Sequence, residues 1–365
     1  MGAGFLQLLG RKVLITLVIA AAASIATLVL KSVNANSVLV FSISAVALAA
    51  LASLVGDGTD QLGHRMGPGA TGVLQSALGN LPELFISIFS LQAGLLIVVQ
   101  SALIGSILAN SLLVLGLAFF LGGLKNGVQK FGTSATRLVS TLLLLAVAAL
   151  AIPTLATAPG APDAGHAESL SIICAVVLLV VFVASIPFSL QGGPGASNES
   201  PNEDENIWPL PLALGTLAVA GLAAAFVSDW FVEALKPAMA TLGMSEAFAG
   251  LVVVAIAGNA VENVVGVQMA MRNKPDFALS LILNSSLQVA LALTPVLVII
   301  SQFIGSTHLT LVLPMLLLAS VALTTILVQL IVYDGESTWL EGLALIGLYI
   351  IIAASVWWGP TIAAP

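Results

Sequence analysis

The segment Gly79-Asn80-Leu81-Pro82-Glu83 is repeated 179 positions later (258 minus 79) as Gly258-Asn259-Ala260-Val261-Glu262. In each copy the asparagine and the glutamate are three residues apart, so one helical turn places them on the same face. The leading glycine permits an unwound turn or a close backbone approach. Pro82 also removes an amide donor, which frees the carbonyl of Leu78. The two copies therefore predict two similar polar elements.

The glutamates of this motif are isolated charges in apolar surroundings. Glu83 is the only charged residue in the segment 66–124, and Glu262 is the only one in the segment 247–271. A carboxylate at membrane depth costs about 2.5–3.5 kcal/mol on insertion scales, so such residues are rare unless they have a function. The matching motifs indicate one polar site that is assembled from both halves of the chain.

The composition places the chain in a membrane. Of 365 residues, 59% are hydrophobic and 7% are charged, and the mean hydropathy is +1.12. A soluble domain has about 25% charged residues. We interpret the apolar run from Arg11 to Leu30 as a first transmembrane helix rather than a signal peptide, because it is long enough to span. The expected fold class is an all-α integral membrane protein.

Windows long enough to cross about 30 Å of hydrocarbon predict eleven transmembrane helices. These windows are 11–31, 37–56, 70–92, 98–122, 136–156, 169–190, 209–228, 247–270, 277–302, 309–332 and 338–358.

The basic residues support this count. With a cytoplasmic N-terminus and eleven crossings, eight basic residues fall on the cytoplasmic side and two, Lys31 and Lys236, on the outer side. This distribution follows the positive-inside rule. We therefore expect a multi-pass protein of a prokaryotic plasma (inner) membrane, with its C-terminus outside. The cytoplasmic basic residues are Arg11, Lys12, Arg65, Lys125, Lys130, Arg137, Arg272 and Lys274.

The two motifs fall in the third and eighth windows, five crossings apart. An odd separation inverts the second copy relative to the first, which predicts one extra N-terminal helix followed by two inverted five-helix repeats. Transporters built in this way place the substrate near the bilayer midplane, on interrupted helices. The expected divisions are the N-terminal helix (1–36), the first repeat (37–190), an acidic cytoplasmic linker (191–208) and the second repeat (209–365).

Further oxygen donors follow each motif, and the offset of 179 also aligns Ser106 with Ser285. Carboxylate, amide and carbonyl oxygens are the ligands that Ca²⁺ prefers. Neither Cys nor His lies near the motifs, which disfavours zinc. A lone Ser, Gln or Asn in a membrane helix also serves helix packing, so the assignment depends on the glutamates. Asn110 is in range too. The predicted metal-site residues are Glu83, Glu262, Asn80, Asn259, Gln100, Ser101, Ser106, Ser285, Ser286 and Gln288.

These motifs resemble those of the Ca²⁺/H⁺ antiporter (CAX) family, within the wider cation/Ca²⁺ exchanger superfamily. The resemblance covers residues 56–89, 98–116 and 258–291 and the plan of the spans. It implies that Glu83 and Glu262 bind the ion, with Asn80 and Asn259 beside them. It also implies that groups matching Gln100, Ser106, Ser285 and Gln288 line the pathway.

Two positions depart from the pattern of that family. Ala102 stands where the family has a serine, with Ser101 one place earlier, and a histidine usually follows the second glutamate. Here Asn263 takes this position and removes a titratable group. The choice of cation therefore stays open at this point, and Na⁺, K⁺ and Mn²⁺ are alternatives to Ca²⁺.

The expected function is secondary active antiport of Ca²⁺ and protons by alternating access. Two nearby carboxylates in a poorly hydrated cavity do not readily ionise together, so protons and metal compete for Glu83 and Glu262. A cation channel with an acidic filter is the alternative class, and inverted repeats argue against it. No activated nucleophile or His-rich centre indicates an enzyme. We expect no cofactor and no nucleic-acid partner; the partners are the lipid bilayer, Ca²⁺ and protons, and a homo-oligomer is left open.

Overall fold

The structure is a computed structural model. It describes residues 2–63, 65, 78–158, 160–161, 163–190, 207–304 and 308–358, without the side chains of residues 2–8, 187–190 and 261–262.

Nearly all of the described chain is helical, as expected for apolar segments whose backbone groups must be satisfied without water. The α-helices are α1 (Gly2–Ser32), α2 (Ser37–Gly63), α4 (Leu81–Gln92), α5 (Leu96–Leu108), α6 (Leu115–Asn126), α7 (Thr133–Ala156), α8 (Ala167–Leu190), α9 (Leu210–Leu242), α10 (Glu246–Phe248), α11 (Ala255–Gly258), α12 (Ala260–Met271), α13 (Pro275–Gln288), α14 (Thr294–Ser301), α15 (Met315–Ile331) and α16 (Trp339–Trp357). Three π-helical turns, η1 (Ala109–Val114), η2 (Ala249–Val254) and η3 (Val289–Leu293), join α5 to α6, α10 to α11 and α13 to α14.

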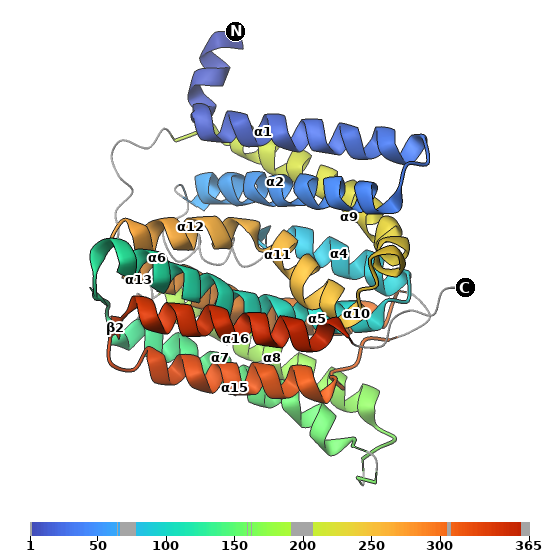
Figure 1. Cartoon of the computed structure of the whole chain (residues 1–365), viewed down its shortest axis with the longest axis vertical. Helices are drawn as coiled ribbons and strands as arrows, with labels where there is room; N and C mark the ends of the chain where they lie inside the picture. Colours follow the sequence, from blue (N-terminus) through green and yellow to red (C-terminus); the bar gives the residue numbers. More distant parts are fainter. Residues whose placement is uncertain are drawn as a thin grey trace.

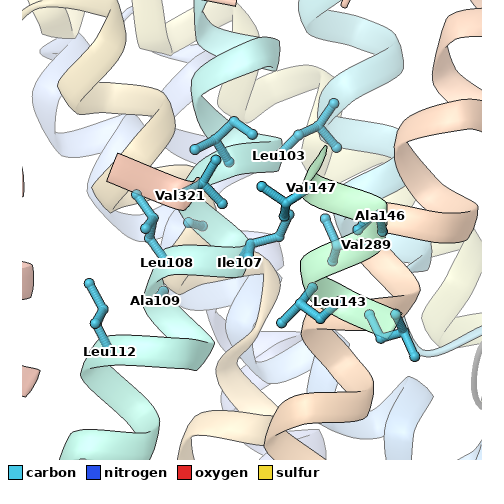
Figure 2. Close-up of a cluster of buried hydrophobic side chains, with 14 of the residues drawn as sticks. Leu103, Ile107, Leu108, Ala109, Leu112, Leu143, Ala146, Val147, Val289 and Val321 are labelled. Atoms are coloured by element: carbon cyan, nitrogen blue, oxygen red, sulfur yellow. The ribbon is translucent and has the colours of Figure 1, made fainter. Parts of the chain in front are cut away.

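The helices lie side by side in one bundle, with α1 at one edge and α7, α8 and α15 at the opposite edge (Figure 1). Two large clusters of buried apolar side chains hold the bundle together, one around α2 and α9 and one around α5–α8 and α13–α16, and a small third cluster joins α1, α2 and α9. Figure 2 shows part of the second cluster, where Leu103 and Ile107 of α5 lie near Leu143 and Val147 of α7. Helices α4 and α5 and the turn η2 contribute to both large clusters, so they lie between them.

Eight described helical segments are long and apolar enough to cross a membrane. A ninth crossing results if the bent pair Glu246–Gly258 and Asn263–Met271 is counted as one span. The apolar helices α4 and α15 are shorter, with 12 and 17 residues. The fold is therefore an all-helical membrane fold with eight to nine candidate spans by length, and each of the eleven predicted windows overlaps at least one of its helices.

Helices α2 and α9 are longer than predicted. The windows 37–56 and 209–228 stop before acidic residues, whereas α2 continues to Gly63 and α9 to Leu242. Asp57 and Asp229 are thus helical residues. Hydropathy windows end where charges begin, but an α-helix satisfies its own backbone hydrogen bonds in either solvent, so the charges do not stop it.

One end of the bundle is joined by contacts between turns from the two halves of the chain. Strands β1 (Gln129–Lys130) and β2 (Glu336–Ser337) form a two-residue antiparallel pair that the sequence did not predict. Lys130 Nζ lies 2.9 Å from a carboxylate oxygen of Glu336, and this hydrogen bond raises the pKa of the lysine. The amide nitrogen of Gly132 donates to Asp276 at 2.6 Å. The turns that contain Lys130, Asp276 and Glu336, all predicted to be cytoplasmic, therefore lie next to one another.

Candidate cation-binding site

Both copies of the motif lie where a helix begins. Asn80 precedes α4 and Asn259 precedes α12, so Glu83 and Glu262 are each the third residue of a helix. At the second copy α11 ends at Gly258, and the segments on either side are bent by 63°. The last carbonyl groups of an interrupted helix lose their intrahelical partners. At this break the carbonyl oxygen of Ala255 accepts from both the backbone amide and the side-chain amide of Asn259, at 3.2 Å and 2.8 Å.

The two motifs meet at Gly258 and Glu83. A Cβ atom built on Gly258 would lie 3.3 Å from Cβ and 3.5 Å from Cγ of Glu83. The backbone of the second motif thus packs directly on the glutamate side chain of the first. That side chain is fully buried, with 0% of its surface exposed.

A chain of hydrogen bonds leads from Glu83 into the second half of the protein. Ser106 of α5 donates a hydrogen bond to Oε1 of Glu83. Asn259 Nδ2 donates to Ser106 Oγ at 2.9 Å. Asn110 Nδ2 lies 3.4 Å from Asn259 Oδ1 and 3.0 Å from Ser285 Oγ. The structure therefore joins four of the predicted site residues in one polar cluster.

A second contact between the halves lies next to this cluster. The hydroxyl groups of Ser111 and Ser286 are 3.2 Å apart, and both residues are fully buried. Ser111 belongs to η1, and Ser286 lies in α13 shortly before η3. π-Helical turns are rare in proteins, and many of those that do occur lie at functional sites. Here η1 contributes Asn110 to the polar cluster, and η3 begins at Val289, shortly after Ser285 in the chain.

Asn110 belongs to this polar cluster, although the predicted set of site residues omitted it. It is fully buried, its amide nitrogen contacts both Asn259 and Ser285, and its Oδ1 has no hydrogen-bond partner among the described residues. A signal was available in the sequence, because Asn110 follows Ser106 by four residues and so lies on the same helix face.

Other predicted residues lie outside the hydrogen-bonded cluster. Asn80 is 7% exposed and begins α4. Ser101 packs against Gly250, where an added Cβ would lie 2.8 Å from that of the serine. Gln288 is half-buried at the end of α13. Gln100 donates its amide hydrogens to the carbonyl oxygens of Thr310 and Val312 instead.

Two further predictions cannot be placed in this way. The side chain of Glu262 and residues 191–206 of the predicted acidic linker (191–208) lie outside the described residues. Only the backbone position of Glu262, in the first turn of α12, is described.

A cavity of about 820 Å³ lies away from the polar cluster, at the cytoplasmic end of the predicted topology. Segments 126–139 and 273–283 line it, and it includes no predicted site residue. The carboxyl group of Glu83 is therefore not at the bottom of this cavity.

Fold and site together define a class of protein. The chain has many apolar spans, a broken helix in the middle of the bundle, and a buried carboxylate in contact with both halves. Such features characterise a multi-pass membrane transporter.

Comparison with known proteins gives the family. The model of the sodium/calcium exchanger protein family matches residues 36–191 and 212–358. A Ca²⁺/H⁺ antiporter of Synechocystis sp. is 35% identical over 352 residues, covering 88% of this chain and 92% of the relative. The Ca²⁺/H⁺ antiporter ChaA of Bacillus subtilis is 35% identical over 325 residues, covering 87% and 91%.

Comparison with solved structures gives a result consistent with these relatives. The structure of native YfkE superimposes with a TM-score of 0.81 at 32% identity, covering 94% of this chain and 99% of that one. The H⁺/Ca²⁺ exchanger CAX superimposes with a TM-score of 0.75 at 17% identity, covering 95% and 92%, and shows the same fold. The chain belongs to the Ca²⁺/H⁺ antiporter (CAX) family within the sodium/calcium exchanger superfamily. This confirms the predicted family and the prediction that the protein is a transporter and not an enzyme.

Proposed function

We propose that this protein is a secondary active antiporter that exchanges Ca²⁺ for protons across a prokaryotic plasma membrane. The observation that carries the proposal is the contact between the two halves at the buried carboxylate, where Glu83 touches Gly258 and accepts a hydrogen bond from Ser106. The names of its relatives, Ca²⁺/H⁺ antiporters in two bacteria, support the choice of ions.

The proposed chemistry is competition at oxygen ligands. Glu83 and Glu262 bind either a divalent cation or protons, since two neighbouring carboxylates in a poorly hydrated site do not readily ionise together. The amide oxygen of Asn110 adds a neutral hard ligand of the type that suits Ca²⁺. Because the polar cluster is buried, an ion reaches it only when helices move. Exchange then follows if only the loaded forms reorient.

The proposed topology has eleven crossings. Nine are the candidate spans by length, counting the bent pair as one, and the shorter helices α4 and α15 are the other two. The N-terminal helix (1–36) precedes two inverted repeats (37–190 and 209–365). The positive-inside distribution supports a cytoplasmic N-terminus. The contacts between the turns near Lys130, Asp276 and Glu336, which this topology assigns to one side, also support it.

A cation panel tests the function. Everted vesicles that contain the protein are acidified, and a pH dye reports proton loss when Ca²⁺, Mn²⁺, Na⁺ or K⁺ is added. We expect Ca²⁺ to give a saturable recovery of the dye signal without an open-channel current. A missing response to Ca²⁺ would contradict the proposal, and recovery with another cation alone would identify the substrate as that ion. A conductance that does not saturate would indicate a channel.

Replacement of Asn110 by Ala tests its proposed role as a ligand and as a link between the halves. The variant loses two donated hydrogen bonds and one unpartnered buried oxygen. We expect the half-saturating Ca²⁺ concentration to rise about tenfold, which corresponds to about 1.4 kcal/mol. The measurement is the initial rate of proton movement against Ca²⁺ concentration. An unchanged half-saturating concentration would exclude Asn110 from the site.

A further inference from the structure

An extended segment is buried between α14 and α15. Residues 308–313 are not helical, yet Leu309, Leu311 and Leu313 are only 1%, 2% and 7% exposed. Extended backbone inside a membrane protein needs partners for its amide and carbonyl groups, because no water is there to supply them. The segment must therefore be bonded to its neighbours.

Side chains of the surrounding helices supply these partners in alternation. Three hydroxyl groups accept the amide hydrogens of every second residue, and each N···O distance is 2.9 Å. The pairs are Leu309 with Ser301, Leu311 with Ser171, and Leu313 with Thr154. The hydroxyl of Thr154 also donates to the carbonyl oxygen of Leu311 at 3.0 Å.

Gln100 of α5 completes the set from the other side. Its Nε2 donates to the carbonyl oxygens of Thr310 and Val312, at 2.9 Å and 3.0 Å. The residue is 5% exposed. Since both amide hydrogens are used in this way, the orientation of the Gln100 side chain is set by the extended segment and not by the polar cluster.

The opposite face of α5 is fixed by close backbone contacts. A Cβ on Gly105 would lie 2.5 Å from the Cα of Leu251, and one on Gly250 would lie 2.3 Å from the carbonyl oxygen of Val98. Helix α5 is thus held between η2 and the extended segment. Ser106, which bonds Glu83, follows Gln100 by six residues, or about 9 Å along the helix axis.

We propose that Gln100 is a positioning residue and not a cation ligand: through the segment Leu309–Leu313 it fixes α5, and with it Ser106, beside Glu83. This role rests on the proposed function and refines it: Gln100 leaves the predicted set of cation ligands, and its partner is the segment Leu309–Leu313. Thr154 has the same role, because it lies on α7 and bonds the same segment twice.

The test compares Gln100→Met and Thr154→Val, two substitutions of similar size that remove the donated hydrogen bonds. Both variants and their combination are reconstituted in proteoliposomes. Ca²⁺-driven proton movement is measured against Ca²⁺ concentration, and thermal unfolding is measured in detergent. If Thr154→Val does not accumulate, Ser171→Ala, which loses its bond to the amide of Leu311, takes its place.

We expect Gln100→Met and Thr154→Val to behave alike. Each should lower the maximal rate about threefold and leave the half-saturating Ca²⁺ concentration within about twofold of the wild type. Both variants should melt at a lower temperature than the wild type. The double variant should lose less stability than the sum of the two single losses, because both residues hold the same segment.

Two results would overturn the inference. One is a roughly tenfold rise in half-saturating Ca²⁺ for Gln100→Met while Thr154→Val matches the wild type, which would make Gln100 a ligand. The other is a melting temperature that neither substitution changes. If wild-type vesicles move no protons in response to Ca²⁺, the proposed function fails, whereas the melting comparison still decides whether Gln100 and Thr154 hold one element.

Discussion

Replacing Glu83 by Gln is expected to abolish Ca²⁺-driven proton movement, with a loss of at least about 100-fold, or about 3 kcal/mol. Glutamine keeps the size of the side chain but removes the charge that attracts the cation and the group that takes up the proton. It also replaces the charge-assisted hydrogen bond from Ser106, which is stronger than a neutral one. Dye recovery in everted vesicles measures the effect.

A matched control lies one helical turn away on the same helix. Ser87 is 1% exposed, and its hydroxyl has no hydrogen-bond partner among the described residues. We expect Ser87→Ala to transport at close to the wild-type rate. Glu262→Gln should reproduce the loss seen with Glu83→Gln, since both glutamates take the third position of a helix. Full exchange by either glutamine variant would disprove the proposed site.

The second large effect is expected at Gly105, where α5 and η2 touch backbone to backbone. In Gly105→Ala the new Cβ would lie 2.5 Å from both the Cα and the carbonyl oxygen of Leu251. No side-chain rotation relieves an overlap with backbone atoms, so the two elements must move apart. Overpacking of this kind costs about 1–3 kcal/mol. Because the next residue is Ser106, the displacement should also break the contact with Glu83.

We expect Gly105→Ala to lower both the melting temperature and the transport rate. The control is Gly347→Ala in α16, where an added Cβ meets nothing within 4 Å. Alanine there should be neutral or slightly stabilising, since it favours a helix over glycine by up to about 1 kcal/mol. The measurement is thermal unfolding of the purified proteins in the same detergent. Equal melting temperatures for the two variants would show that the close approach is unimportant.

The sequence predicted the helical membrane fold and the family because their signals are strong and local. Apolar windows reflect the thickness of the bilayer, and an isolated carboxylate such as Glu83 stands out against them. The spacing of Asn259 within its motif also indicated its place near a glutamate. The structure joins it to Glu83 through Ser106.

Contacts between distant segments were beyond such reasoning. The sequence shows that Gln100 is polar and near the motif, but not that it bonds carbonyl groups more than 200 residues later. Periodicity cannot reveal an extended segment among helices, since Leu309–Leu313 reads as part of an apolar window. The helical course of α2 past Asp57 was missed for a related reason, because hydropathy marks where apolar residues end and not where a helix does.

At the π-helical turns η1 and η3, the number of residues in the turn matters as well as their chemistry. A π-turn accommodates one residue more than an α-helical turn of the same height, because its hydrogen bonds connect residues i and i+5. Deleting one residue between Ala109 and Val114 would let the helix close as a regular α-helix with its later residues still in register. A deletion in a regular α-helical turn would instead rotate every later residue of the helix by about 100°. A single-residue deletion at η1 or η3 should therefore disturb the later part of its helix less than a deletion elsewhere in the same helix.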